Sequence, residues 1–77
     1  MNMYMSGFKA LSDLTRLRAL RMILISGSPL CVCELSEALG LPQYQVSKHL
    51  AILRQAGLVT DSRVGTWVYF YVPQDLS

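Results

Sequence analysis

Apolar residues recur every three or four positions along the first third of the chain, which is the spacing of one face of a helix. The pattern predicts a short helix that ends near Leu11 and a second helix over Leu14–Ser26, with Asp13 placed as its N-cap. The Gly-Ser-Pro segment at 27–29 then stops the helical pattern. We expect the buried stripe of these helices to consist of Phe8, Leu11, Leu14, Leu17, Leu20 and Leu24.

Two further helical patterns follow. The first covers Val32–Leu39, and Gly40 stands just after it, where a left-handed residue commonly closes a helix. Pro42 suits the first turn of the next helix, and Gly57 ends that helix. We expect the inward residues to be Leu35, Ala38 and Leu39 in the first helix, and Val46, Leu50 and Leu53 in the second.

The last third of the chain changes to the pattern of strands. Residues 58–60 and 67–72 predict two strands around a loop at 61–66 that contains Gly65. In the second strand, Val68, Phe70 and Val72 share one face, and Trp67, Tyr69 and Tyr71 share the other. The predicted fold is mainly α with a β-hairpin, in the order α-α-α-α-β-β, which is the layout of a winged helix-turn-helix.

Length and composition limit the classes of protein to which the chain can belong. The 77 residues make one small domain, residues 1–77, and 52% of them are apolar while only 16% are charged. One small domain cannot bury this many apolar residues, so we expect a homodimer in which Met3, Tyr4, Phe8 and Leu11 pack against their copies. The sequence holds no apolar stretch long enough for a membrane span and no catalytic constellation, and we expect no signal peptide. We therefore expect a cytoplasmic protein that is not an enzyme.

Charge singles out the fourth helix as a candidate DNA-binding surface. The net charge is +2, and no Asp or Glu occurs between Gln43 and Thr60. With Val46 directed inward, Tyr44 and Lys48 point outward. In a helix-turn-helix, the N-terminal half of the second helix is the part that reaches the edges of the bases. The candidate contacts are Gln43, Tyr44, Gln45, Ser47, Lys48 and His49. An ordinary solvated face explains Gln and Lys equally well, but it explains an exposed tyrosine less well.

The hairpin is a second candidate contact. Its predicted loop holds Arg63 and Gly65, and a basic loop with a flexible glycine suits a minor groove or the phosphates beside it. The alternative is that the hairpin only covers the core.

Cys31 and Cys33 are the only thiols in the chain. Such a pair in a cytosolic chain is more often metal-binding or redox-active than a disulfide. Residues i and i+2 of a regular helix point about 200° apart, so both thiols can bind one ion only where the helix begins between them or unwinds. The alternative is that both are buried as small apolar residues. His49 has no partner at ligand spacing, so a zinc site built on it is not expected.

Four segments resemble the ArsR/SmtB family of metal-sensing transcriptional repressors. The segment from Ala10 to Leu20 is similar to the family's opening helix motif, and Leu30-Cys-Val-Cys-Glu-Leu35 is similar to its arsenic-binding box. The segment from Val46 to Val59 resembles the recognition helix and the entry to the wing, and that from Gly65 to Tyr71 resembles the second wing strand.

The resemblance implies a homodimeric repressor on a palindromic operator, released when a soft ion such as arsenite or antimonite binds thiolates. It implies that Ser47 and His49 contact DNA and that Cys31 and Cys33 bind the ion, with no obligatory cofactor. The chain departs from the family pattern at Leu14, where Pro is usual, at Ser36, where a third Cys is frequent, and at Thr66, where a basic residue is frequent. The family's C-terminal dimerisation helix has no counterpart in these 77 residues.

Three functions are compatible with these residues. The first is a DNA-binding repressor that senses a thiophilic ion. The second is a winged-helix DNA-binding regulator without metal sensing, whose thiols are structural or redox-responsive. The third is a winged-helix module for protein–protein contact, against which the acid-free recognition helix argues.

Overall fold

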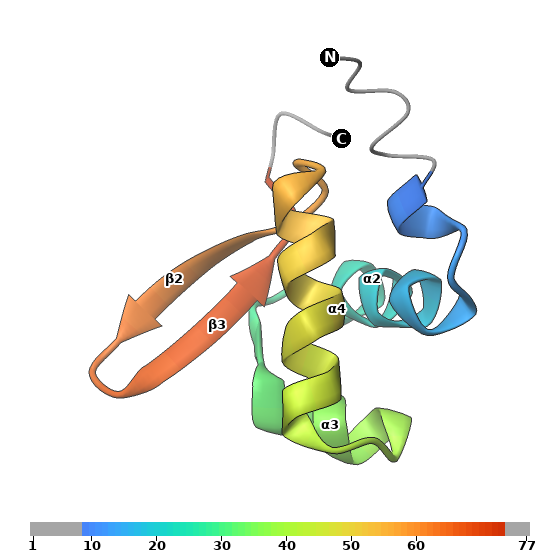
Figure 1. The fold of residues 1–77 in the computed structure, drawn as a ribbon. Coiled ribbons are helices and arrows are strands. Elements are labelled where there is room, and N and C mark those ends of the chain that lie inside the picture. Colours follow the sequence, from blue (N-terminus) through green and yellow to red (C-terminus); the bar gives the residue numbers. More distant parts are fainter. Residues whose placement is uncertain (1–8, 74–77) are drawn as a thin grey trace.

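The computed structural model describes residues 9–73. Residues 9–11 are helical, and α2 (Leu14–Ser26), β1 (Leu30–Cys31), α3 (Val32–Leu39), α4 (Gln43–Gln55), β2 (Thr60–Val64) and β3 (Trp67–Tyr71) follow. The helices pack against one another around α4, and the β2–β3 hairpin projects from this body (Figure 1). The winged helix-turn-helix prediction is confirmed, with one strand more than the sequence indicated. In the described residues no helix is long and apolar enough to cross a membrane.

Local signals set the ends of the helices. The Asp13 side chain accepts hydrogen bonds from the backbone N–H groups of Thr15 and Arg16, and it thereby caps α2 as predicted. Gly40 closes α3 with a φ of 67°, the left-handed conformation that glycine adopts without a steric cost. Pro42 is the N-cap of α4 rather than its first helical residue. The predicted bounds of α2 and α3 are those observed.

The core lies where α2, α3, α4 and β3 meet. Val46, Leu50 and Leu53 of α4 are fully buried, as the stripe predicted, and so is Leu35 of α3. Ala38, expected to face inward, is exposed. The inward face of α3 is centred on Leu35 and the partly buried Leu39, so Ala38 falls on the solvent side.

The predicted stripe of α2 is largely wrong. Leu14, Leu17 and Leu24 are 62%, 43% and 57% exposed, whereas the buried residues of the helix are Ala19 and Ile23. The helix is apolar on more than one side, and the small Ala19 lets the neighbouring elements approach closely. Leu11 and Leu20 pack against the core as expected, and Phe8 lies outside the described residues.

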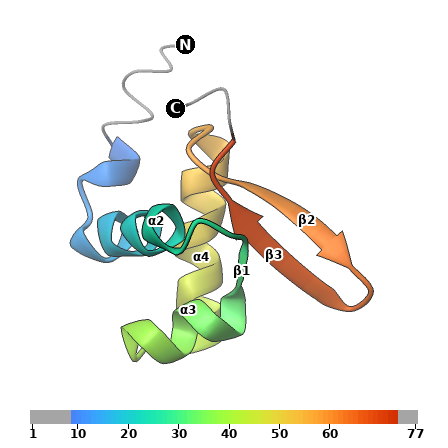
Figure 2. The same ribbon diagram turned by 180° about the vertical axis from the view of Figure 1, so that it is seen from behind.

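The sheet has three antiparallel strands in the order β1-β3-β2. The sequence pattern does not predict β1, which pairs Leu30 with Phe70 and Cys31 with Tyr69 (Figure 2). β2 and β3 pair along five residues each, from Thr60–Tyr71 to Val64–Trp67, so the predicted loop at 61–66 shrinks to the turn at Gly65 and Thr66. The polar sequence of β2 indicates a loop, but its backbone is held extended by this pairing.

Candidate nucleic-acid interface and thiol pair

The N-terminal half of α4 presents most of the predicted DNA-contacting residues to solvent. Gln43, Tyr44, Ser47 and Lys48 are exposed, and Tyr44 shows 66% of its surface. Gln45 and His49 are half-buried at the sides of this face. The buried Val46 and Leu50 hold the helix against the core, so its polar side is fixed outward.

The first turn of α4 has free backbone donors. Pro42 caps the helix without any side-chain hydrogen bond, and the first turn has no acidic residue. The backbone N–H groups of Gln45 and Val46 donate to the Pro42 carbonyl, so those of Gln43 and Tyr44 have no partner within the helix. Unpaired N–H groups and the helix dipole together favour an anion at this end.

His49 is tied to the helical body through Arg16. The Arg16 guanidinium donates to the Ala10 carbonyl at 2.6 Å, and its Nη1 lies 3.4 Å from His49 Nδ1. The backbone N–H of Arg16 lowers the pKa of Asp13; the N–H of Thr15 and the nearby side chains of His49 and Arg16 act in the same direction, and desolvation opposes them. These contacts join the start of α2 to the middle of α4. Arg16 was not among the sequence candidates, because the contact spans 33 positions.

The basic residues of α4 and the hairpin divide into paired and unpaired ones. In residues 9–73 the one ion pair joins Arg54 Nη1 to Asp61 Oδ2 at 3.0 Å, at the C-terminal end of α4. Lys48 and Arg63 are exposed and take no part in this ion pair. Arg63 does not lie in the turn, as predicted, but in β2 opposite Val68, because the strand continues to Val64.

The two cysteines flank the start of α3. Cys31 is the N-cap and Cys33 lies within the first turn, so the helix begins between them, which is the geometry that the spacing required. The two sulfur atoms lie together, joined in a disulfide, with Cα atoms 5.4 Å apart. Cys31 is buried, and Cys33 is half-buried. The described residues contain no cluster of three or more Cys, His, Asp or Glu side chains suited to an ion.

Glu34 and Ser36 hold the two ends of α3. The Cys31 N–H donates to Glu34 Oε1 at 2.9 Å, which fixes the start of the helix. The Ser36 hydroxyl, at the position of the third thiol in the arsenic box, donates to the Leu41 carbonyl at 2.5 Å and so fastens the turn before α4. Glu34 was not among the residues predicted from the sequence to be important, although a Glu three residues after an N-cap has the spacing of a capping box.

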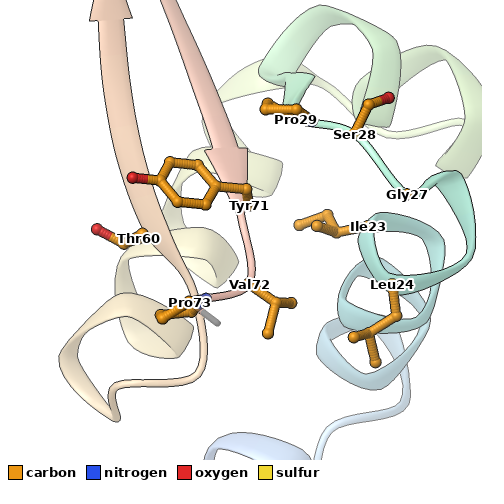
Figure 3. A pocket seen from close by; sticks show the side chains of 9 residues that line it. All are labelled: Ile23, Leu24, Gly27, Ser28, Pro29, Thr60, Tyr71, Val72 and Pro73. Carbon is orange, nitrogen blue, oxygen red and sulfur yellow. The ribbon is translucent and has the colours of Figure 1, made fainter. Parts of the chain in front are cut away.

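An open pocket of about 700 Å³ lies on the side of the molecule formed by the end of α2 and the end of β3. Figure 3 shows Ile23 and Leu24 on one side of it and Tyr71 and Val72 on the other. Its lining offers apolar surface and no pair of groups for acid–base chemistry. The pocket therefore adds nothing to the interface on α4.

Comparison with known proteins agrees with this geometry. Residues 13–61 match the model of the family described as bacterial regulatory protein, arsR family. The arsenic resistance transcriptional regulator ArsR1 of Pseudomonas putida is 52% identical over 63 residues, covering 82% of this chain and 48% of that protein. The arsenical resistance operon repressor of Escherichia coli is 44% identical over 63 residues, covering 82% of this chain and 53% of that protein. The chain thus spans about half the length of these two relatives.

Solved structures show the same fold. HlyU from Vibrio cholerae superposes with a TM-score of 0.84 at 33% identity, covering 96% of this chain and 79% of that one. The homodimeric winged helix-turn-helix DNA-binding domain of a possible ArsR-family regulator from Mycobacterium bovis gives a TM-score of 0.86 at 27% identity, covering 96% and 68%. With the helix-turn-helix, the hairpin and the matched segment in place, this chain belongs to the ArsR family of bacterial regulatory proteins.

Proposed function

We propose that this protein is a sequence-specific DNA-binding transcriptional repressor that acts in the cytoplasm. The observation that carries the proposal is the N-terminal half of α4, where Gln43, Tyr44, Ser47 and Lys48 are exposed beside unpaired backbone donors and no acidic residue. In a major groove, Gln43 suits adenine, Lys48 suits guanine or a phosphate, and Ser47 suits either kind of partner. Each well-placed base contact contributes about 1–3 kcal/mol of discrimination.

Residues beside this face complete the proposed interface. Gln45 and His49 border the helix face, with His49 held by Arg16, and Arg63 extends the positive charge onto the hairpin. Arg63 contributes to affinity rather than to sequence preference, because a phosphate contact carries no base information.

A homodimer on a palindromic operator fits this surface. A two-fold axis would set two recognition helices about one turn of DNA apart, roughly 34–36 Å. The solved domain from Mycobacterium bovis is homodimeric. In this chain α2 exposes Leu14, Leu17, Leu24 and Ile25. Burying these apolar side chains against a second copy would contribute favourable free energy to a dimer. Of the dimer face expected from the sequence, Met3, Tyr4 and Phe8 lie outside the described residues, and Leu11 packs against the core.

Arsenite, antimonite or a related thiophilic ion is the proposed inducer. Two relatives are named for arsenic or arsenical resistance, and Cys31 and Cys33 place two soft sulfur donors side by side at the start of α3. The disulfide must first be reduced. Each thiol then displaces one hydroxyl of arsenous acid and releases water, and a small thiol or the remaining hydroxyl fills the third position.

Two paths lead from the thiol pair to the DNA-contacting elements. Along the chain, α3 leads to the turn that Ser36 and Gly40 form before α4. Across the sheet, Cys31 pairs with Tyr69 of β3, which belongs to the hairpin. An ion that holds Cys31 and Cys33 in a new geometry therefore acts on both elements. A coupling of about 1–3 kcal/mol between ion and DNA binding suffices for release.

The test uses a duplex that the protein itself selects from a random pool. Fluorescence anisotropy of this duplex, under reducing conditions, measures affinity with and without arsenite. We expect a steep salt dependence, preference over a scrambled duplex, and affinity about 5–150-fold lower with arsenite. The matched control is the Cys31→Ser, Cys33→Ser double variant, which should bind equally well and ignore arsenite. If nothing is selected, the DNA-binding proposal fails; if the wild type ignores arsenite and antimonite, only the sensor proposal fails.

The disulfide favours a second candidate function, a redox-responsive regulator. Oxidation of the two thiols releases two protons and two electrons to an oxidant such as a peroxide, and the bond joins Cys31 to Cys33 across the start of α3. The same assay, with hydrogen peroxide and then dithiothreitol in place of arsenite, measures this response. A reversible change in affinity that the double cysteine variant lacks would support the redox candidate. No change would leave the ion as the remaining signal.

A further inference from the structure

The guanidinium of Arg16 connects the helical turn before α2 to the middle of α4. Its Nε donates to the Ala10 carbonyl at 2.6 Å, and its Nη2 donates to the Lys9 carbonyl at 3.3 Å. The remaining nitrogen, Nη1, lies 3.4 Å from His49 Nδ1. Because the guanidinium is planar and two of its nitrogens are already held, the position of Nη1 is fixed with them. Arg16 thus presents a fixed N–H to the Nδ1 edge of the His49 ring.

This contact determines which nitrogen of His49 carries the proton. An arginine side chain has N–H donors and no acceptor, so His49 Nδ1 interacts with Nη1 only through its lone pair. A neutral imidazole has one donor nitrogen and one acceptor nitrogen. With Nδ1 as the acceptor, the proton lies on Nε2. A proton on Nδ1 would place two donors against each other, and a flipped ring would lose the contact with Arg16.

The Nε2 atom of His49 is available to an external partner. Within residues 9–73 it takes part in no hydrogen bond, and no side-chain nitrogen there is both buried and unpaired. Because His49 is only half-buried, its Nε2 therefore reaches solvent. The residue borders the exposed face of α4, directly after the exposed Lys48. An Nε2–H at this place donates to a lone pair, which DNA offers on phosphate oxygens and on the acceptor atoms of base edges.

We propose that Arg16 is a positioning residue for DNA binding, which orients the His49 ring and keeps its proton on Nε2, where the N–H donates to a lone pair on the DNA. This inference rests on the proposed DNA-binding function and extends it to a residue that acts through another. An ordered ring loses less conformational freedom on binding, so the contact improves affinity. Since the same guanidinium binds the carbonyls of Lys9 and Ala10, it also couples the turn before α2 to the recognition surface.

The first test is spectroscopic and needs no DNA. His49 is the only histidine in the chain, so its ring nitrogens give one set of ¹⁵N NMR signals, which report the atom that carries the proton. At a pH where the ring is neutral, we expect a single form with the proton on Nε2. In Arg16→Met the two nitrogen shifts should move toward each other, because the ring then samples both forms. The matched control, Arg18→Met, removes the same charge from an exposed position of α2 and should leave both shifts unchanged.

The second test is a double-mutant cycle on the duplex selected by the protein, with affinity measured by anisotropy at fixed salt. Arg16→Met should weaken binding by about twofold to tenfold, the factor that ordering one side chain supplies. In a His49→Ala background the same substitution should have little further effect. A purely structural or long-range electrostatic role of Arg16 would instead lower affinity by the same factor in both backgrounds.

The acceptor on the DNA is identified by His49→Ala alone. A loss of affinity that is equal for the selected and a scrambled duplex assigns the contact to a phosphate, which carries no base information. A loss confined to the selected duplex assigns it to a base edge. Unchanged affinity for both duplexes would show that His49 makes no such contact and would overturn the inference.

Other outcomes also separate this inference from the proposed function. A wild-type ring with its proton on Nδ1, or ring shifts that do not respond to Arg16→Met, would overturn the inference while DNA binding stands. If Arg16→Met does not fold, Arg16→Lys takes its place, because one ammonium group cannot hold both carbonyls and the ring, and the same shifts and cycle are expected. If no duplex is selected, the proposed function fails, and the inference fails with it.

Discussion

The two helices of the helix-turn-helix, α3 and α4, use their N-terminal ends in opposite ways. At α3, Glu34 accepts the Cys31 N–H, an acid occupies the first turn, and a disulfide spans the start. At α4, Pro42 provides no side-chain cap, and the first turn is free of acids. Both helices bury leucines in the same core. One helix end is thus closed by the protein's own groups, and the other is left available to an external anion.

The difference shows how neighbouring helices take separate tasks. A helix start held by its own carboxylate and sulfurs is sensitive to whatever changes those sulfurs. A helix start without a side-chain cap depends on packing for its stability. In α4 this packing comes from the buried Val46, Leu50 and Leu53. DNA affinity should therefore respond to changes on α4, while ion response and local stability should respond to changes on α3.

The largest expected effect comes from the open face of α4. Lys48→Ala together with Ser47→Ala should lower affinity for the selected duplex by about 10²-fold or more, because each contact contributes about 1–3 kcal/mol. Thermal unfolding should barely change, since both side chains are exposed. Titration at fixed salt measures the affinity, and Ala38→Ser at an exposed position of α3 is the control. Unaltered affinity in the double variant would show that α4 is not the recognition helix.

A smaller effect is expected at the end of α3. Ser36→Cys adds a third thiol but removes the hydroxyl that donates to the Leu41 carbonyl. We expect tighter arsenite binding together with a loss of about 0.5–1.5 kcal/mol in the free energy of unfolding, the usual net contribution of one hydrogen bond. Arsenite titration and urea unfolding measure the two effects. Weaker arsenite binding would mean that fastening the turn matters more to the site than a third sulfur.

The smallest effects come from exchanging charge between the two helix starts. Gln43→Glu puts an acid in the first turn of α4 and should stabilise the fold by about 0.3–1 kcal/mol, because a negative charge favours this end of the dipole. The same variant should bind DNA more weakly, because it repels phosphates. Glu34→Gln on α3 should destabilise the fold by a similar amount and leave duplex affinity unchanged. Stability and affinity that fall together in Gln43→Glu would contradict the comparison.

The helices of the fold were predictable because their signals are local. Asp13, Gly40 and Pro42 mark helix ends through their own backbone and side-chain preferences, and Val46, Leu50 and Leu53 of α4 form one buried stripe at helical spacing. The exposed positions of the candidate interface followed from the same periodicity. The start of α3 between the two cysteines was foreseen as a condition for a shared ion, but the spacing of Cys31 and Cys33 does not specify whether they are thiols or a disulfide.

What could not be predicted depends on partners distant in the sequence. β1 is only two residues long and exists because it pairs with β3, about 40 positions later. β2 has the sequence of a loop, and only its pairing with β3 holds it extended. On α2, leucines occur on several sides, and the choice of Ala19 and Ile23 as the buried face is made by the neighbouring helices. The contact of Arg16 with His49 belongs to the same class.

The order of the sheet leaves β2 as a long outer strand, whose free backbone groups are a template on which another extended chain can assemble. Two of its five residues, Asp61 and Arg63, are charged, and a strand added at that edge would have to remove their charges from water. β1 covers the other side of β3 only at Tyr69 and Phe70. The charges of β2 thus make this hairpin a poor seed for aggregation, even where the local concentration of the chain is high.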